Sequence, residues 1–199
     1  MKHLSLLLAA GLLSACSILP QSEPLNIYLL PATALPTQTQ AVDWSLRIGT
    51  PSSGELFDGT RIVVLPAPGR INTYQGARWS ERTPQLVRQR LLDAFQDDGR
   101  IKALSTEEQH LQADLELVSE LRSFQSQYRD DRPEAQIQLN VRLVDVRAQR
   151  IVASHRFSAR QAASNTSVAA VVAAFGQASD QLSRELVDWT LSEGQRSRR

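Results

Sequence analysis

The sequence has little cysteine, a net charge close to zero and no long hydrophobic run. Its 199 residues include one Cys, which excludes an intrachain disulfide framework. Lys and Arg number 22 against 21 Asp and Glu, and this balance argues against a nucleic-acid-binding protein, which would carry a basic excess. No stretch of about 20 apolar residues is present, so no membrane-spanning helix is predicted. With 42% hydrophobic residues, the chain is predicted to fold as one domain with a substantial core.

Motifs that carry catalysis are also missing. The sequence has no HExxH motif, and His110, His155 and one Cys supply too few ligands for a zinc site. It has no G-x-S-x-G elbow, no Walker loop and no dinucleotide fingerprint. His155 alternates with Phe157 on an expected strand, which favours a core or edge position over a catalytic one. We therefore predict that the protein is not an enzyme and holds no metal or cofactor.

The N-terminus carries the clearest targeting signal. Lys2 precedes an apolar run over residues 4–13, and Ser14, Ala15 and Cys16 follow. Ten apolar-rich residues make a helix of roughly 15 Å, about half the hydrocarbon thickness of a bilayer. Residues 1–15 are therefore predicted to be a signal peptide. The segment Leu13-Ser14-Ala15-Cys16 resembles the lipobox of bacterial lipoproteins, which implies cleavage before Cys16 and acylation of that residue; the alternative is an ordinary signal peptide with an accidental Cys.

The mature chain is expected to be neutral and anchored by lipid alone. Cleavage before Cys16 removes Lys2 and no acidic residue, leaving 22 − 1 = 21 basic against 21 acidic groups. A neutral protein gains little from anionic headgroups, so stable attachment requires acyl chains. Residues 16–25 form a short polar tether in this interpretation, with a reach of at most about 35 Å.

Hydrophobic periodicity predicts one α+β domain over residues 26–192. Apolar and polar residues alternate most clearly over residues 135–143, with partner strands expected at residues 111–124 and 151–159. Shorter strands are expected at residues 26–30, 44–48, 61–65, 70–74 and 101–104. Thr83 and Pro84 are expected to start a helix that Gly99 ends, and a second amphipathic helix is predicted over residues 167–191. The expected fold is a single mixed, mostly antiparallel sheet with two amphipathic helices packed on one face, followed by a frayed basic tail at residues 193–199.

Two groups of residues are candidates for contact with a protein partner. Trp79 and Arg78 lie in a polar segment before the first helix, and Trp and Arg are enriched at interface hot spots. The alternative for Trp79 is a packing role between helix and sheet. The other candidates are Gln136, Gln138 and Arg142, because the polar side of their strand should face solvent or a partner.

The order of motifs resembles the ABC-type transport auxiliary lipoprotein family, in particular its paraquat-inducible branch. The resemblance covers nearly the whole mature chain. It rests on the lipobox and on these segments: Tyr28-x-Leu30, Arg61-Ile62-Val63-Val64, Ala77-Arg78-Trp79-Ser80-Glu81, residues 115–124 and Val141-Arg142-Leu143-Val144-Asp145. One departure is the turn Ala148-Gln149-Arg150, where such a hairpin is expected to carry a Gly.

The resemblance implies a non-enzymatic accessory to lipid traffic across the Gram-negative envelope. Its implied partners are a periplasmic MCE-domain protein and an inner-membrane ABC transporter, with phospholipid or sterol-like cargo. A ring-shaped partner also makes a homo-oligomer an expectation. Ser17 stands where lipoproteins retained in the inner membrane usually have Asp, which implies an anchor in the outer membrane with the domain facing the periplasm. The rival hypotheses are a lipoprotein cofactor of an outer-membrane assembly or cell-wall synthase machine and, third, an envelope hydrolase.

Overall fold

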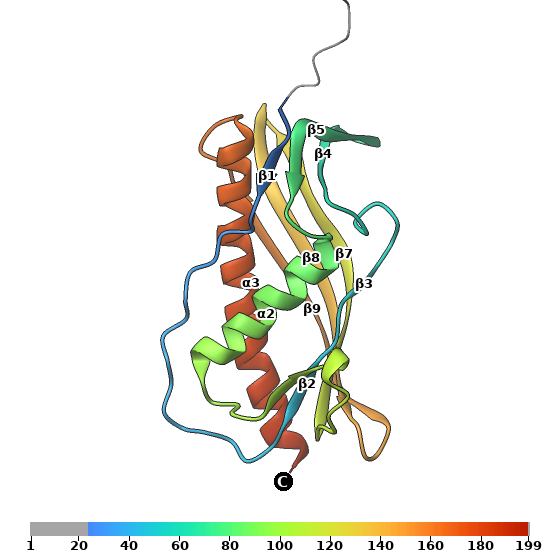
Figure 1. The fold of residues 1–199 in the computed structure, drawn as a ribbon, viewed down its shortest axis with the longest axis vertical. Coiled ribbons are helices and arrows are strands. Elements are labelled where there is room, and N and C mark those ends of the chain that lie inside the picture. Colours follow the sequence, from blue (N-terminus) through green and yellow to red (C-terminus); the bar gives the residue numbers. More distant parts are fainter. Residues whose placement is uncertain (1–23, 199) are drawn as a thin grey trace, which may run out of the picture.

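The computed structural model describes residues 24–198 and shows a mixed sheet with two long helices (Figure 1). The predicted α+β class is confirmed. Within the described part of the chain the sheet has nine strands: β1 (Asn26–Tyr28), β2 (Leu46–Ile48), β3 (Ser52–Ser53), β4 (Arg61–Ala67), β5 (Arg70–Trp79), β6 (Leu104–Thr106), β7 (Leu115–Arg129), β8 (Arg132–Asp145) and β9 (Arg150–Ala162). The helices are α2 (Thr83–Asp98) and α3 (Val168–Ser197), with a short 3₁₀ turn, η2 (Glu107–Gln109).

The long strand β7 organises the sheet. On one side it pairs antiparallel with β8, which pairs antiparallel with β9. On the other side β2, β3 and β4 each pair with β7 in parallel. Beyond β2 lies β6, which is parallel to it. Beyond β4 lies β5, which is antiparallel to β4, and β1 pairs in parallel with the far side of β5.

The prediction of a mostly antiparallel sheet was wrong. Five of the eight strand pairings within residues 24–198 are parallel, although the two longest pairings are antiparallel. Alternation in the long strands reveals hairpins, whereas two- and three-residue strands carry no directional signal of their own. In the structure α3 contacts β8 and β9, and α2 contacts α3, β2 and β6. The placement of both helices on one face of the sheet stays a prediction.

A bulge in β7 explains how its core residues change phase. Leu115, Leu117 and Leu121 are buried and lie two and four residues apart, so they share one side of the strand, as the alternation predicts. The register with β8 shifts between Leu121 and Ser123, which brings Phe124 to the buried side although it lies three residues after Leu121. The strand can therefore continue to Arg129, beyond its predicted end at residue 124.

Residues with positive φ close both long hairpins without glycine. Asp130 and Asp131 have φ values of 48° and 60° between β7 and β8, which are the backbone angles of a two-residue hairpin turn. Gln149 has a φ of 51° in the turn between β8 and β9. Gln149 thus takes the conformation for which the family resemblance suggested a Gly.

Helix α2 begins and ends almost where the sequence predicts. Gly99 adopts a φ of 74° and ends the helix, with its N–H donating to the carbonyl of Phe95. The predicted capping role of Thr83 was wrong. Arg82 is the N-cap residue, and the Thr83 hydroxyl instead donates to the carbonyl of Gly59 at 3.0 Å. This bond ties the start of α2 to the loop before β4.

Helix α3 is longer than predicted. It begins after Ser167, whose hydroxyl accepts a hydrogen bond from the Ala170 N–H at 3.2 Å, and it continues to Ser197. Residues 193–197 are therefore helical rather than frayed. Gly194 allows this because a Cβ there would lie 2.5 Å from the Trp44 ring, so only Gly permits the close approach. An ion pair between Arg198 and Asp114 at 3.2 Å holds the end of the helix against the sheet.

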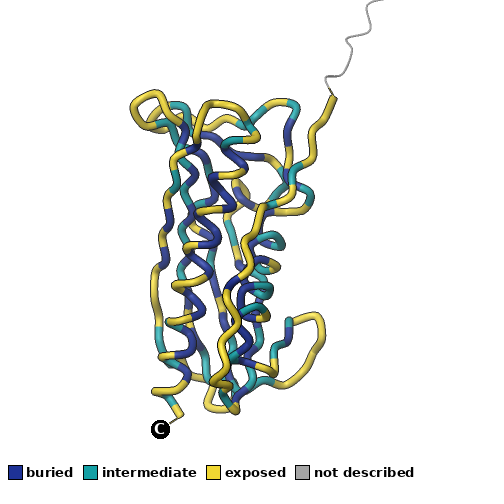
Figure 2. The backbone as a smooth tube through the Cα atoms, turned by 90° about the vertical axis from the view of Figure 1, so that its left-hand side faces the viewer, coloured by how far each residue is buried: buried dark blue, intermediate teal, exposed yellow. Residues whose placement is uncertain are grey.

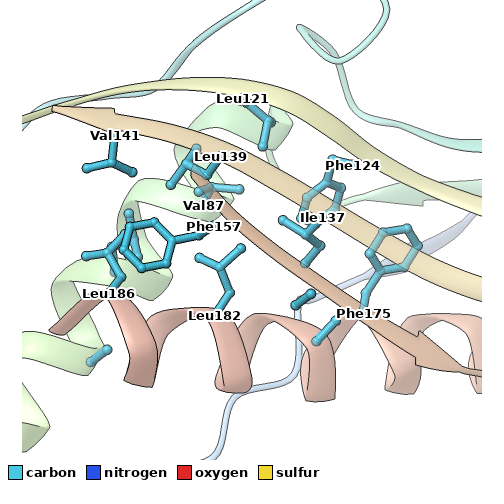
Figure 3. Packing of buried hydrophobic residues seen from close by; sticks show 14 of the residues in the cluster. Val87, Leu121, Phe124, Ile137, Leu139, Val141, Phe157, Phe175, Leu182 and Leu186 are labelled. Carbon is cyan, nitrogen blue, oxygen red and sulfur yellow. The ribbon is translucent and has the colours of Figure 1, made fainter. Parts of the chain in front are cut away.

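The core lies between the helices and the long strands (Figure 3). Phe175, Leu182 and Leu186 of α3 point toward the sheet. They belong to the same buried cluster as Ile137 and Leu139 of β8. Burying one such side chain contributes about 1.5–3 kcal/mol. Figure 2 shows buried and exposed residues alternating along the same elements, as the amphipathic pattern predicts.

A segment that we call the strap, residues 31–41, has no regular structure and runs past both helices (Figures 1 and 2). It is held by a buried ion pair between Arg90 of α2 and Asp180 of α3, with 2.8 Å between Nη2 and Oδ1. The Thr33 N–H donates to Asp180 at 3.1 Å, and Arg90 Nη2 donates to the Thr33 carbonyl at 3.1 Å. Pro31 lies against Gly176 of α3, and a Cβ atom added to Gly176 would be only 2.8 Å from the Pro31 Cβ. The strap and both helices therefore form one packed unit.

Candidate interaction surface

The structure places Trp79 in the core. Its side chain is 1% exposed, and its ring lies 5.7 Å from that of Phe124 and 5.3 Å from that of Phe175, both edge-to-face. Arg78 precedes it on β5 and is exposed, because successive residues of a strand point to opposite faces. Of the two interpretations of Trp79, the structure supports packing, and we remove Trp79 from the candidate contact surface.

Gln136, Gln138 and Arg142 lie together on the side of β8 that faces away from the core. Between them on the strand stand the buried residues Ile137, Leu139 and Val141. Arg160, Ser158 and Ser154 of β9 are their register partners, so the polar pattern continues onto the neighbouring strand. We call this surface the outer sheet face: Glu120, Arg122, Gln136, Gln138, Asn140, Arg142, Ser154, Arg156, Ser158 and Arg160. Arg78 lies on β5, which the strands β4 and β7 separate from β8.

A hydrogen-bonded chain crosses three strands at the centre of the outer sheet face. Arg122 donates to Glu120 at 2.7 Å, Asn140 donates to Glu120 at 3.3 Å, and Arg156 donates to Asn140 at 3.0 Å. The hydrogen bonds from Arg122 and Asn140 lower the pKa of the Glu120 carboxyl group. A shallow depression of about 310 Å³ adjoins the chain, and Arg142 forms part of its wall.

The outer sheet face suits recognition of a polar or acidic protein surface. Its guanidinium groups can donate in pairs to carboxylates, and the glutamine side chains can both donate and accept. Glu120 is already bonded to Arg122, so its charge is compensated within the face. Sequence reasoning found the residues on β8 but missed Arg156 and Arg160. The signal for them was the alternation already used to predict the strand over residues 151–159.

A second depression, of about 690 Å³, opens at the end of the molecule near the C-terminus. Asp114 stands in its wall and accepts hydrogen bonds from the Ser45 N–H at 2.9 Å and the Ser45 hydroxyl at 2.8 Å. These bonds, with a smaller contribution from Arg198, lower the pKa of the Asp114 carboxyl group. Asp114 therefore joins the N-terminal part of the sheet to the end of α3, which is a structural role.

The remaining titratable candidates also have structural neighbours. His155 is exposed, with its ring 4.6 Å from that of Phe157 and 6.0 Å from that of Trp189. Among residues 24–198, no three His, Cys, Asp or Glu side chains are grouped so that they could hold a metal ion. Neither long helix in this part of the chain is apolar enough to cross a bilayer. Cys16 and Ser17 lie outside the described residues, so lipidation stays a prediction.

Comparison with known proteins identifies the family. The model of the ABC-type transport auxiliary lipoprotein component family matches residues 28–187. The chain belongs to this family. The match confirms the family resemblance seen in the sequence, and the family is described as an auxiliary lipoprotein component of ABC-type transport.

Two solved structures share the fold of this chain, and a curated protein is similar to it in sequence. Protein XCC0632 from Xanthomonas campestris is 36% identical with a TM-score of 0.81, covering 86% of this chain and 98% of its own. Another solved structure, of an uncharacterised protein, is 14% identical with a TM-score of 0.64, covers 83% of this chain and 98% of its own, and shares the fold. An uncharacterised protein of Bradyrhizobium diazoefficiens is 29% identical over 147 residues, which is 74% of this chain. The chain spans 39% of the length of that relative.

Proposed function

We propose that the protein is an outer-membrane-anchored periplasmic lipoprotein and a non-enzymatic component of an MCE/ABC-type lipid transport system. The observation that carries this proposal is the family match over residues 28–187. The proposed role is to bind a periplasmic MCE-domain protein that works with the ABC transporter, with phospholipid or sterol-like cargo. A homo-oligomer would present the same surface several times to a ring-shaped partner.

The outer sheet face is the proposed contact surface for the MCE-domain protein. It is formed by three long strands that are hydrogen-bonded to each other over their length, so its side chains are held on a rigid support. Its polar groups alternate with core residues, and changes on it can therefore leave the core intact. These properties allow a direct test by charge reversal.

Negative charge introduced on the outer sheet face is expected to weaken partner binding without unfolding the domain. The double variant Gln138→Glu/Arg142→Glu places two carboxylates where the proposal requires amide and guanidinium groups. We expect co-purification of the MCE-domain protein from envelope membranes to fall about tenfold or more, which corresponds to about 1.4 kcal/mol. Arg184→Glu on the exposed side of α3 is the matched control and should leave binding unchanged. Equal binding by all three proteins, with unchanged melting temperatures, would contradict the proposed surface.

The anchor is tested by two substitutions near the N-terminus. Cys16→Ala removes the proposed acylation site, so we expect the protein to leave the membrane fraction, because the described domain has no apolar helix that could hold it there. Ser17→Asp is expected to move the lipidated protein from outer-membrane to inner-membrane fractions. Density-gradient fractionation and intact mass measure both results. A Cys16→Ala protein that is cleaved at the same site and still sediments with membranes rules out the lipid anchor.

A further inference from the structure

An exposed apolar strip lies on β1 and its flanks. Leu25, Ile27 and Leu29 are 52%, 57% and 75% exposed, and they occupy every second position. Tyr28 and Leu30, which alternate with them, pack against the core. The strip therefore points outward because the other side of β1 is needed for packing. Neighbouring exposed aliphatic side chains of this kind mark interaction sites more often than apolar residues scattered singly over a surface.

Two exposed arginines continue the strip across the neighbouring strands. Ile27 is in register with Arg78 of β5, and Arg78 is in register with Arg61 of β4. Like charges directly opposite one another on paired strands are unfavourable. Among residues 24–198, neither Arg61 nor Arg78 has a carboxylate within ion-pair distance. An anionic group bound between them would remove this repulsion.

The strip lies at the end of the molecule where the described chain begins (Figure 1). Leu25 follows Cys16 by nine residues, which can span at most about 30 Å even when fully extended. An acyl group on Cys16 would thus confine β1 to the neighbourhood of a bilayer surface. Apolar side chains that reach the interfacial layer add to the membrane binding that acyl chains supply, because binding grows with the buried apolar area.

We propose that the β1 strip rests on the bilayer that holds the anchor, with Leu25, Ile27 and Leu29 in the interfacial layer and Arg61 and Arg78 at lipid phosphates. This inference rests on the proposed lipidation of Cys16. A second copy of the chain is a poorer occupant, because three aliphatic side chains supply far less than the about 800 Å² per partner of a stable interface. Contact with the bilayer fixes which end of the domain is near the membrane and leaves the outer sheet face free for a partner.

Site-specific fluorescence tests this contact on the full lipidated protein. Since acylation consumes the one native thiol, an Ile27→Cys variant has a single free thiol for an environment-sensitive dye. Ile151→Cys is the matched control, because Ile151 is 55% exposed against 57% for Ile27 and lies in β9, which the strands β5, β4, β7 and β8 separate from β1. The proteins are reconstituted in vesicles of phosphatidylethanolamine and phosphatidylglycerol, with and without a lipid that carries a spin-label quencher on its acyl chain. We expect blue-shifted emission and quenching at position 27 and neither at position 151.

Each other outcome has a defined meaning. Flotation with the vesicles but equal quenching at the two positions overturns the strip contact and leaves the anchor intact. A blue shift at position 27 without quenching by the labelled lipid shows that protein covers the strip, which also overturns the proposal. Failure of the lipidated protein to float contradicts the anchor itself, and the inference fails with it.

The arginines have a separate test. The Arg61→Gln/Arg78→Gln variant, labelled at position 27, is compared with its parent in vesicles of phosphatidylcholine with and without phosphatidylglycerol. We expect the parent to show stronger quenching in the anionic vesicles and the variant to lose that difference. The same preference in both proteins would overturn the role of Arg61 and Arg78.

Discussion

Replacing Asp180 with Ala is expected to destabilise the domain by about 3–5 kcal/mol, because it leaves the Arg90 guanidinium buried without its counterion. Arg90 is 4% exposed, and Asp180 is its partner in the only charge pair that links α2 to α3 beneath the strap within residues 24–198. The same substitution removes the acceptor of the Thr33 N–H. Urea unfolding followed by circular dichroism measures the loss.

Asp188→Ala provides the control on the same helix. Asp188 forms an ion pair with Arg100 at 2.7 Å, but its side chain is 65% exposed, so we expect a loss of about 0–1 kcal/mol. The double variant Arg90→Met/Asp180→Leu is expected to recover much of the stability, because apolar residues of similar volume need no counterion. Equal losses for Asp180→Ala and Asp188→Ala would show that the buried pair does not fasten the strap.

Replacing Trp79 with Ala is expected to cost about 3–5 kcal/mol of unfolding free energy. The ring is enclosed by Phe124 of β7 and Phe175 of α3, so its removal leaves a cavity between the sheet and the helix. Arg78→Ala, one residue earlier and exposed, is expected to change stability by about 0.5 kcal/mol or less. Thermal and urea unfolding compare the two variants.

The pair of variants also distinguishes packing from partner contact. If Trp79→Ala kept its stability and lost binding of the MCE-domain protein, the ring would have to be available to a partner, contrary to its burial in the structure. A destabilised Trp79→Ala that still binds when folded would agree with the packing role.

The sequence predicts the parts of the fold whose pattern is local. Alternation over residues 135–143 places Ile137 and its neighbours in the core, and Gly99 marks the end of α2. The parallel pairing of β2, β3 and β4 could not be predicted, because strands of two to seven residues acquire their direction from β7. The bulge after Leu121 could not be predicted either. It shifts the alternation of buried and exposed residues at Arg122 and Ser123, and because both are polar the sequence shows no break there.

The exposed residues were likewise predictable only where the sequence pattern is local. Gln136, Gln138 and Arg142 were predicted to share a polar face because their strand alternates without interruption. Trp79 was ambiguous, because the polar residues around it in sequence gave no sign that β5 extends as far as Trp79. Ile27 gave the opposite problem: an apolar run suggests burial, and only the edge position of β1 shows that one side of it faces solvent.

Site-specific photocrosslinking in intact envelopes tests most directly whether the outer sheet face binds an MCE-domain protein. A photoreactive residue at position 138 is compared with the same residue at position 184, on the exposed side of α3. We expect position 138 to form an adduct containing a periplasmic MCE-domain protein and position 184 to form none, as identified by mass spectrometry. Adducts at position 138 that contain an outer-membrane assembly factor or a cell-wall synthase, or no partner at all, would contradict this prediction.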